Sequence, residues 1–164
     1  MVLELARIFE NEGSRLPFDY VVKTDGSGIP ADARFPSGIA AKGVVENHCG
    51  MVTLTGTVDF AYRAPCDRCA AEVVRAYSIP LSHQLIRQLH SDETDEYIAV
   101  ENSSLLLDEL IYEDAILALP MRFLCREDCK GLCPICGADR NEGDCGCKKP
   151  SDPRLAVLEQ LLNE

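Results

Sequence analysis

Apolar and polar residues alternate most regularly between residues 39 and 62, and this pattern predicts two β-strands, at residues 39–46 and 51–62. One face of the second strand collects apolar or small side chains: Val52, Leu54, Gly56, Val58 and Phe60. The residues between the two segments read Asn-His-Cys-Gly, a composition typical of a turn. The two strands are therefore expected to form a hairpin with one apolar face.

Shorter apolar runs extend this β-rich pattern on both sides of the hairpin. The chain is expected to begin with a strand that runs into a short helix, until the break at residues 11–14. Further strands are predicted at residues 16–22, 72–79, 97–100 and 105–107, with an apolar continuation at 83–86. Loops are predicted at residues 24–33 and at the acidic run 91–96, which is interpreted as a solvated connection.

Two segments have helical periodicity. The first is expected from residue 109 to about residue 119, with Asp108 as its N-cap and Pro120 ending it. Its apolar stripe is Leu107, Leu110, Ile111, Ala115, Ala118 and Leu119, while Glu109, Tyr112 and Glu113 are expected on the outer side. A terminal helix follows residue 151, with Asp152 as cap and an apolar face of Leu155, Leu158, Leu161 and Leu162.

These elements predict an α+β fold: an antiparallel, barrel-like sheet packed by one helix, then a Cys-rich zinc lobe and a terminal amphipathic helix. The expected divisions are residues 1–120 for the β-rich core, which includes a CxxC hairpin tip, 121–150 for the zinc lobe and 151–164 for the last helix. The length of 164 residues suits one ordinary domain with a small appendage.

Composition indicates the compartment. The hydrophobic fraction of 46% and the charged fraction of 26% are typical of globular proteins. No apolar run approaches the roughly 20 residues of a membrane span, and the first residues lack the basic leader of a signal peptide. We therefore expect a cytoplasmic protein, in which thiols stay reduced and clustered cysteines bind metal rather than form disulfides.

Charge restricts the partners. Twenty-seven acidic residues against sixteen basic ones give a net charge of −11. Nucleic acid binding through a broad basic surface is therefore not expected, because a phosphate backbone attracts positive charge. Any contact with RNA has to be local or carried by a partner protein.

Cysteines are the most informative residues, because six of the nine fall between residues 125 and 147. The sequence Cys133-Pro-Ile-Cys136-Gly137 is typical of a metal knuckle, in which a tight turn brings two thiolates to one ion. With Cys145 and Cys147 it forms what we call the local quartet. Four thiolates complete the closed tetrahedral shell that is expected of structural zinc, and iron is the alternative ion.

The remaining cysteines predict a second, less local site. Cys66 and Cys69 form another CxxC, and Cys125 and Cys129 another close pair, so these four can form a long-range quartet. Cys49 is then left without a partner. A disulfide cluster is the alternative for the six-cysteine stretch, and the histidines at 48, 83 and 90 are expected to be ordinary surface or core residues.

Catalytic motifs are missing from the sequence: there is no phosphate-binding loop, no GxSxG and no HExxH. We therefore expect a protein that is not an enzyme, with no catalytic residue and no small-molecule substrate. A thiol oxidoreductase acting through Cys66 and Cys69 is the enzymatic alternative. It is disfavoured because Asp67 and Glu72 oppose thiolate formation and because the pair follows a predicted strand, not a helix N-terminus.

A family resemblance rests on three stretches. These are the CDRC of residues 66–69, the run ILALPMRFLCREDCKGLCPICG of residues 116–137, and DPRLAVL of residues 152–158. Together they closely resemble the bacterial and plastid YceD family, the large ribosomal RNA subunit accumulation proteins. The resemblance covers the second half of the chain well, whereas the first half is only compatible with it.

The resemblance implies a non-enzymatic factor in the synthesis, processing or accumulation of large-subunit ribosomal RNA. The partner would be the precursor RNA, or a ribosomal or processing protein that the acidic surface attracts. Relatives vary in their cysteines: some keep only a CxxC and a Cys or His pair at positions matching Cys66, Cys69, Cys125 and Cys129, and others have few or none. This variation implies that the metal stabilises the fold and does not carry out a reaction, and it supports the pairing into two sites, which would hold two structural zinc ions. A zinc-ribbon adaptor unrelated to ribosomes is the alternative function.

Overall fold

The computed structural model describes residues 1–23, 34–87 and 97–147. The chain forms two compact units: the first is Met1–Ala64 with Val74–Met121, and the second is Pro65–Val73 with Arg122–Glu164. The CxxC of residues 66–69 thus groups with the cysteine-rich segment. The loops predicted at residues 24–33 and 91–96 and the terminal helix lie outside the described residues.

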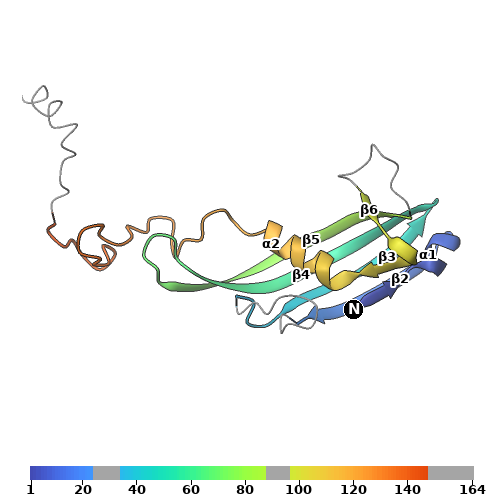
Figure 1. Ribbon diagram of the computed structural model, residues 1–164, viewed down its shortest axis with the longest axis horizontal. Helices are drawn as coiled ribbons and strands as arrows, with labels where there is room; N and C mark the ends of the chain where they lie inside the picture. Colours follow the sequence, from blue (N-terminus) through green and yellow to red (C-terminus); the bar gives the residue numbers. More distant parts are fainter. Residues whose placement is uncertain (24–33, 88–96, 148–164) are drawn as a thin grey trace, which may run out of the picture. The chain divides into compact units, whose positions relative to one another are not determined.

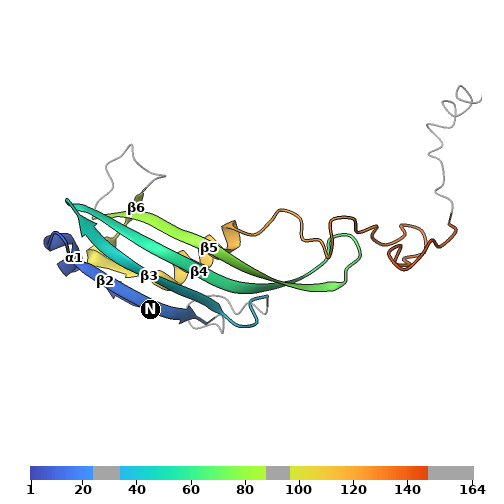
Figure 2. The same cartoon turned by 180° about the vertical axis from the view of Figure 1, so that it is seen from behind.

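The first unit is built on a curled, half-barrel sheet of five strands, as predicted (Figures 1 and 2). In spatial order the strands are β2 (Arg15–Val22), β3 (Ile39–His48), β4 (Met51–Pro65), β5 (Glu72–Ile86) and β6 (Tyr97–Ala99). β3 pairs antiparallel with both β2 and β4, whereas the short edge strand β6 runs parallel to β5. The predicted antiparallel arrangement therefore holds for β2, β3 and β4, but not for the edge pair β5 and β6.

Alternation in β4 separates its core and outer faces. Val52, Leu54, Val58 and Phe60 are buried, as the pattern predicts. Gly56 lies on the same face opposite Gly43 of β3, and a Cβ at Gly43 would run into the carbonyl oxygen of Thr55. The strands therefore approach each other more closely here than side chains would allow, as is typical of a point where a sheet bends.

The β3–β4 hairpin is tighter than predicted. β3 continues to His48, and only Cys49 and Gly50 form the turn, with φ values of 52° and 82°. Two positive φ values in a two-residue loop define a type I′ turn, whose twist matches that of the flanking strands. Asn47 extends the strand because its buried side chain donates to the Ile8 carbonyl (2.7 Å) and accepts from the Gly50 N–H (3.0 Å).

Strand β5 is also longer than predicted, since it continues through Pro80 to Ile86. Proline lacks an N–H and is normally confined to edges. In the described part of the chain β6 pairs with β5 only at residues 84–86, so β5 is still an edge strand at Pro80. The missing donor therefore need not interrupt the sheet.

One face of the sheet is covered by α2 (Leu107–Leu117), as the two opposite views show (Figures 1 and 2). Its buried side chains are Leu107, Leu110, Ile111 and Ala115, which confirms most of the predicted stripe, although Ala118 is exposed beyond the end of the helix. Tyr112 was expected on the outer side but is half-buried, and its ring centroid lies 5.9 Å from that of Phe35. Phe35 also contacts Phe60 and Tyr62, at 5.6 and 5.3 Å, so an aromatic cluster joins helix and sheet.

The prediction of Asp108 as N-cap is wrong. The helix begins at Leu107, its cap position is Leu106, and no side chain caps it. Asp108 lies in the first turn, where its carboxylate pairs with the amino group of Met1. A negative charge in the first turn still favours the helix through the macrodipole.

The N-terminal segment has the predicted strand and short helix, β1 (Val2–Glu4) and α1 (Ala6–Glu10). β1 pairs antiparallel with β7 (Ser104–Leu106) in a separate two-stranded sheet, and the 3₁₀ turn η1 (Glu101–Ser103) precedes β7. Leu3, Leu5 and Ile8 are buried, so the segment completes the core of the first unit.

Candidate metal centres

The CxxC at residues 133–136 forms the predicted knuckle. The Cys133 N–H donates to the Ala138 carbonyl at 2.8 Å, and the Gly137 N–H donates to the Cys133 carbonyl at 2.9 Å. Gly137 has a φ of 74°, a conformation that glycine adopts without a Cβ penalty. These two bonds close the turn on itself and direct both thiols to the same side.

The CxxC at residues 66–69 has the same backbone hydrogen bonds. The Cys66 N–H donates to Ala71 at 2.8 Å, and the Ala70 N–H donates to Cys66 at 2.9 Å. Ala70 occupies the position equivalent to Gly137 with a φ of 59°. The left-handed conformation costs an alanine about 1 kcal/mol, so glycine is the residue expected at this position of a knuckle. With alanine there, the sequence does not indicate that residue 70 completes one.

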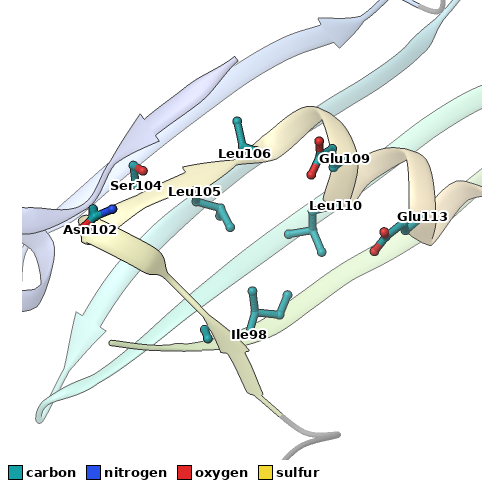
Figure 3. A pocket seen from close by; sticks show the side chains of 9 residues that line it. Ile98, Asn102, Ser104, Leu105, Leu106, Glu109, Leu110 and Glu113 are labelled. Carbon is teal, nitrogen blue, oxygen red and sulfur yellow. The ribbon is translucent and has the colours of Figure 1, made fainter. Parts of the chain in front are cut away.

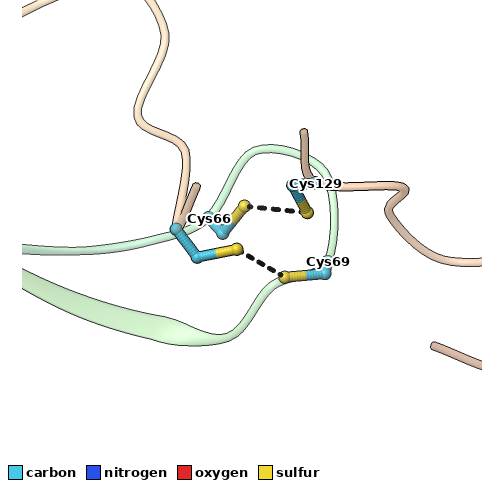
Figure 4. A group of neighbouring side chains, drawn as sticks. Cys66, Cys69 and Cys129 are labelled. Atoms are coloured by element: carbon cyan, nitrogen blue, oxygen red, sulfur yellow. Dashed lines mark hydrogen bonds between the residues drawn. The ribbon is translucent and has the colours of Figure 1, made fainter. Parts of the chain in front are cut away.

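The long-range quartet is assembled within the second unit. The sulfur atoms of Cys66, Cys69, Cys125 and Cys129 all lie within 4.8 Å of one another. Two sulfur–sulfur distances are 3.8 Å (Cys66 to Cys129) and 3.7 Å (Cys69 to Cys125), and Figure 4 shows the sulfurs of Cys66 and Cys129 facing each other. Cys66, Cys69 and Cys129 are buried, and Cys125 is partly buried.

These distances distinguish metal ligation from disulfide bonding. A disulfide joins sulfurs at about 2.05 Å, and all nine cysteines are free. A tetrahedral ion with Zn–S bonds of about 2.3 Å places its ligands about 3.8 Å apart, close to the two distances above. Two sulfur pairs of the long-range quartet therefore already have the separation that a tetrahedral ion of the size of zinc requires, and all four sulfurs lie within 4.8 Å of one another.

The local quartet brings together Cys133, Cys136, Cys145 and Cys147, with all sulfurs again within 4.8 Å of one another. Cys133 is buried, but the other three are exposed. A pocket of about 480 Å³ at this quartet is also lined by Arg140 and Asp144. Both groups can thus accept an ion, but the local quartet lies open to solvent whereas the long-range quartet is enclosed.

Hydrogen bonding divides the thiols of each quartet into acidic and weakly acidic members. Backbone N–H groups, first that of Cys125 and then that of Cys69, lower the pKa of Cys66 from 9.0 to about 6. The N–H groups of Cys136 and Ile135 lower the pKa of Cys133 to about 6 in the same way. N–H donors stabilise the negatively charged thiolate, both when the thiol has lost its proton and when the sulfur binds a metal ion.

The neighbouring thiols have the opposite shift. Hydrogen bonding to Cys129, together with burial, raises the pKa of Cys125 to about 12. Hydrogen bonding to Cys136 and Cys145 raises the pKa of Cys147 to about 12. Crowded thiols cannot all ionise without a compensating cation, so each quartet needs positive charge to become fully deprotonated.

Residues outside the two quartets hold the long-range quartet together, and no sequence motif marks them. The Asp67 carboxylate accepts from the Phe123 N–H at 2.7 Å, while the Asp67 N–H donates to the Phe123 carbonyl at 2.9 Å. The Arg68 guanidinium donates to the Cys129 carbonyl at 2.7 Å, and the Leu132 N–H donates to the Arg68 carbonyl at 2.9 Å. The two variable residues of the CxxC thus dock the knuckle onto the segment that supplies the other two sulfurs.

Asn141 links the two quartets. It lies between Cys136 and Cys145 in the sequence, yet its side-chain amide donates to the Cys129 sulfur of the long-range quartet at 3.4 Å. This contact is the main cause of the lowered pKa of Cys129. Its side-chain oxygen accepts from the Lys130 N–H and the Arg126 guanidinium, both at 2.8 Å.

The remaining candidate residues have other surroundings. Cys49 is exposed in the β3–β4 turn, and His48 precedes it. His83 Nε2 lies 2.7 Å from an Asp114 carboxylate oxygen in the first unit. His90 lies outside the described residues. In the part of the chain that the structure describes, groups of three or more potential metal ligands consist of cysteines alone.

The fold and these groups define the class of the protein: a half-barrel sheet covered by one helix, with a lobe of two four-cysteine groups that can hold metal ions. The model of the family described as "Large ribosomal RNA subunit accumulation protein YceD" matches residues 54–162. The chain belongs to this family.

Relatives come from two bacterial groups. "Uncharacterized protein YlbN" of Bacillus subtilis (strain 168) is 30% identical over 142 residues, which cover 83% of this chain and 81% of the relative. "Uncharacterized protein Rv2926c" of Mycobacterium tuberculosis (strain ATCC 25618 / H37Rv) is 32% identical over 122 residues, 72% of this chain and 59% of the relative. No solved structure matches the chain.

Proposed function

We propose that the protein is a non-enzymatic factor in the synthesis, processing or accumulation of large-subunit ribosomal RNA, and that it binds the precursor RNA or an assembly partner in the cytoplasm. The observation that carries the proposal is the family match over residues 54–162, which spans both quartets and α2. No helix in the described ranges is long and apolar enough to cross a membrane.

Each quartet is proposed to hold one zinc ion with a structural role. Four thiolates fill the tetrahedral shell and leave no position for water or substrate, so the ion would supply cross-linking and not Lewis-acid chemistry. The N–H donors to Cys66 and Cys133 support this role, because they offset the negative charge of a four-thiolate centre.

Charge favours a protein partner over direct RNA binding. The net charge is −11, and each zinc bound by four thiolates would carry a further formal charge of −2. In the described part of the second unit, Arg126 already contacts Asp128 and Asn141, which leaves this cation less available to a phosphate. A basic ribosomal or processing protein would be attracted by the same field that repels RNA.

Co-sedimentation tests the function. Cell extract is fractionated on a sucrose gradient, with and without nuclease and at low and high salt. We expect the protein to migrate with large-subunit precursor particles, to stay with ribosomal proteins after nuclease treatment, and to dissociate at high salt because the contact is electrostatic. The proposal would be contradicted if the protein migrated as free protein, separate from the precursor particles, under every condition.

Metal content tests the structural role. Cys133→Ser and Cys136→Ser are each expected to lower the zinc content by one ion per chain and to make the local quartet sensitive to protease, because thiolate ligation is coupled to folding. Cys49→Ser is the matched control, since Cys49 is outside both quartets. Native mass spectrometry counts the ions. Unchanged metal content and protease resistance in the two ligand variants would refute the local site.

A specific observation favours a second candidate function, a thiol oxidoreductase: the pKa of Cys66 is lowered to about 6, which suits a nucleophilic thiolate. Against it, the Cys66 residue is only 2% exposed, and its sulfur faces Cys129 at 3.8 Å. The zinc-loaded protein is therefore expected not to reduce an insulin or small-molecule disulfide. Turnover that disappears in Cys66→Ser would establish the redox function instead.

A further inference from the structure

A pocket on the first unit has two carboxylates beside an apolar floor. Its volume is about 410 Å³, within the range of roughly 300–1,000 Å³ that ligand pockets span. β6, β7 and α2 each contribute to it. Figure 3 shows Ile98, Leu105 and Leu110 pointing toward one another, with Glu109 and Glu113 along the helix.

Two of the four carboxylates of α2 have a partner and two have none in the described ranges. Asp108 is paired with the Met1 amino group, and Asp114 lies 2.7 Å from His83. No ion pair joins Glu109 or Glu113 to another residue of the described ranges, and both side chains are exposed. The two unpaired carboxylates of the helix are therefore the two that line the pocket.

This arrangement is unfavourable for an isolated helix. Glu109 and Glu113 are four residues apart, a spacing at which like charges repel by about 0.2–0.5 kcal/mol. Leu106, also at the pocket, is 53% exposed although it lies next to the buried Leu105 and Leu107. Both costs would be offset by a ligand that brings positive charge to the carboxylates and an apolar group to Leu106.

We propose that this pocket binds a basic segment of a partner protein, in which an apolar side chain flanked by lysine or arginine fills the floor while the cations contact Glu109 and Glu113. The proposed function supplies only the kind of partner, a ribosomal or processing protein. RNA does not fit, because its phosphates would face the two carboxylates. A second copy of the chain carries the same net charge of −11 and is repelled.

The chain's own C-terminal sequence is also a poor occupant. Residues 151–164 contain three acidic side chains, Asp152, Glu159 and Glu164, against the single Arg154. A segment of that composition would add negative charge to the pocket. The partner is therefore expected to come from another protein.

Peptide binding tests the site on the zinc-loaded full chain. The probe is a fluorescent short peptide in which lysine and arginine alternate with leucine, and its anisotropy is measured at low salt. The double variant E109Q/E113Q is expected to weaken binding about fivefold, as for two exposed ion pairs, and the effect is expected to vanish near 0.5 M salt, roughly where screening is complete. D19N/D59N is the matched control, with the same change in charge at two exposed positions outside the pocket.

The apolar contact has its own variants. Leu106→Ser is expected to weaken peptide binding about fivefold, because about half of a leucine side chain remains to be covered. Met51→Ser, at a residue 58% exposed outside the pocket, is expected to have no effect. Equal binding by wild type and E109Q/E113Q, equal loss in the D19N/D59N control, or tighter binding of a single-stranded RNA oligonucleotide that depends on Glu109 and Glu113 would each overturn the proposal.

The same variants separate this site from the proposed function. If E109Q/E113Q co-sediments with precursor particles as wild type does, the pocket is not the contact, while the ribosomal function stands. If wild type binds the peptide but never co-sediments with the particles, the pocket stands and the ribosomal function fails. Circular dichroism and thermal melting show that the variants are folded. Glu109 lies in the first turn of α2, where its negative charge favours the helix, so the loss of that interaction offsets the removal of the repulsion between the glutamates and Tm is expected to change little.

Discussion

The amide of Asn141 is expected to strengthen zinc binding at a quartet to which it contributes no ligand. Asn141→Ala removes its bond to the Cys129 sulfur. A hydrogen bond to a charged acceptor contributes about 1.5–3 kcal/mol, and the length of 3.4 Å favours the lower value. A loss of about 1.5 kcal/mol corresponds to about tenfold weaker zinc binding, at the lower end of the effects of outer-shell partners.

Asn141→Asp distinguishes the sulfur contact from the backbone contact. Aspartate keeps an oxygen that can accept from Lys130, but it cannot donate to the sulfur and it adds a negative charge beside a thiolate. We therefore expect Asn141→Asp to bind zinc more weakly than Asn141→Ala. Asn11→Ala is the control, because it removes an exposed asparagine that donates to the Arg7 carbonyl of the first unit.

Two measurements complete this test. Competition with a chromophoric chelator gives the zinc affinities, and cadmium-113 resonances show which quartet has lost its ion. The reasoning would be refuted if the Asn141→Asp variant bound zinc at the long-range quartet as tightly as the wild type does. So would weakening confined to the local quartet, because it would mean that Asn141 only shapes its own loop.

Three further outcomes follow from the geometry. Ala70→Gly should raise the free energy of unfolding of the zinc-loaded protein by about 0.5–1 kcal/mol, and Gly137→Ala should lower it by a similar amount, because only glycine adopts a positive φ without strain. Urea unfolding measures both changes. Equal effects of the same sign would contradict the equivalence of the two knuckles. Zinc should be released on acidification, because protons compete for the thiolates. In the metal-free protein, the lowered pKa values of Cys66 and Cys133 contribute stability that is complete above their ordinary value of 9.0 and is lost as the pH falls through about 6. Zinc per chain after dialysis from pH 8 to pH 5 measures the release, and full retention would contradict it. Gly43→Val should destabilise the first unit by several kcal/mol, roughly the cost of severe overpacking, since its Cβ would run into Thr55; a thermal melt like that of wild type would show that the strands can separate without cost.

The fold was largely predictable wherever one face of a strand or helix is buried. Burial imposes a period of two on β4 and a helical period on α2, and these patterns are visible in the sequence. The errors concern boundaries that depend on distant partners. Asp108 pairs with Met1, which is 107 positions away in the sequence, and Asn47 extends β3 through its hydrogen bond to the Ile8 carbonyl.

The two groups of sulfurs were predictable to different degrees. The local quartet followed from the spacing of residues 133–147, whereas Cys66 and Cys69 were joined to Cys125 and Cys129 only by arithmetic and by the family resemblance. The structure brings the sulfurs of each group within 4.8 Å. The supporting residues were not predictable, because Asp67, Arg68 and Asn141 are ordinary polar residues whose partners are defined only by the folded chain.

The span of the long-range quartet bears on how the chain is made. Cys69 and Cys125 are 56 positions apart, so β5, β6, β7 and α2 all lie between the two halves of this cluster. A cross-link over such a loop restricts the unfolded chain by about 4 kcal/mol, on the scale of a disulfide of that length. On a translating ribosome the first knuckle emerges well before its partners do. A product that ends prematurely would keep two unsatisfied thiols at its surface, and capture of the ion would therefore mark a chain whose synthesis has passed residue 129.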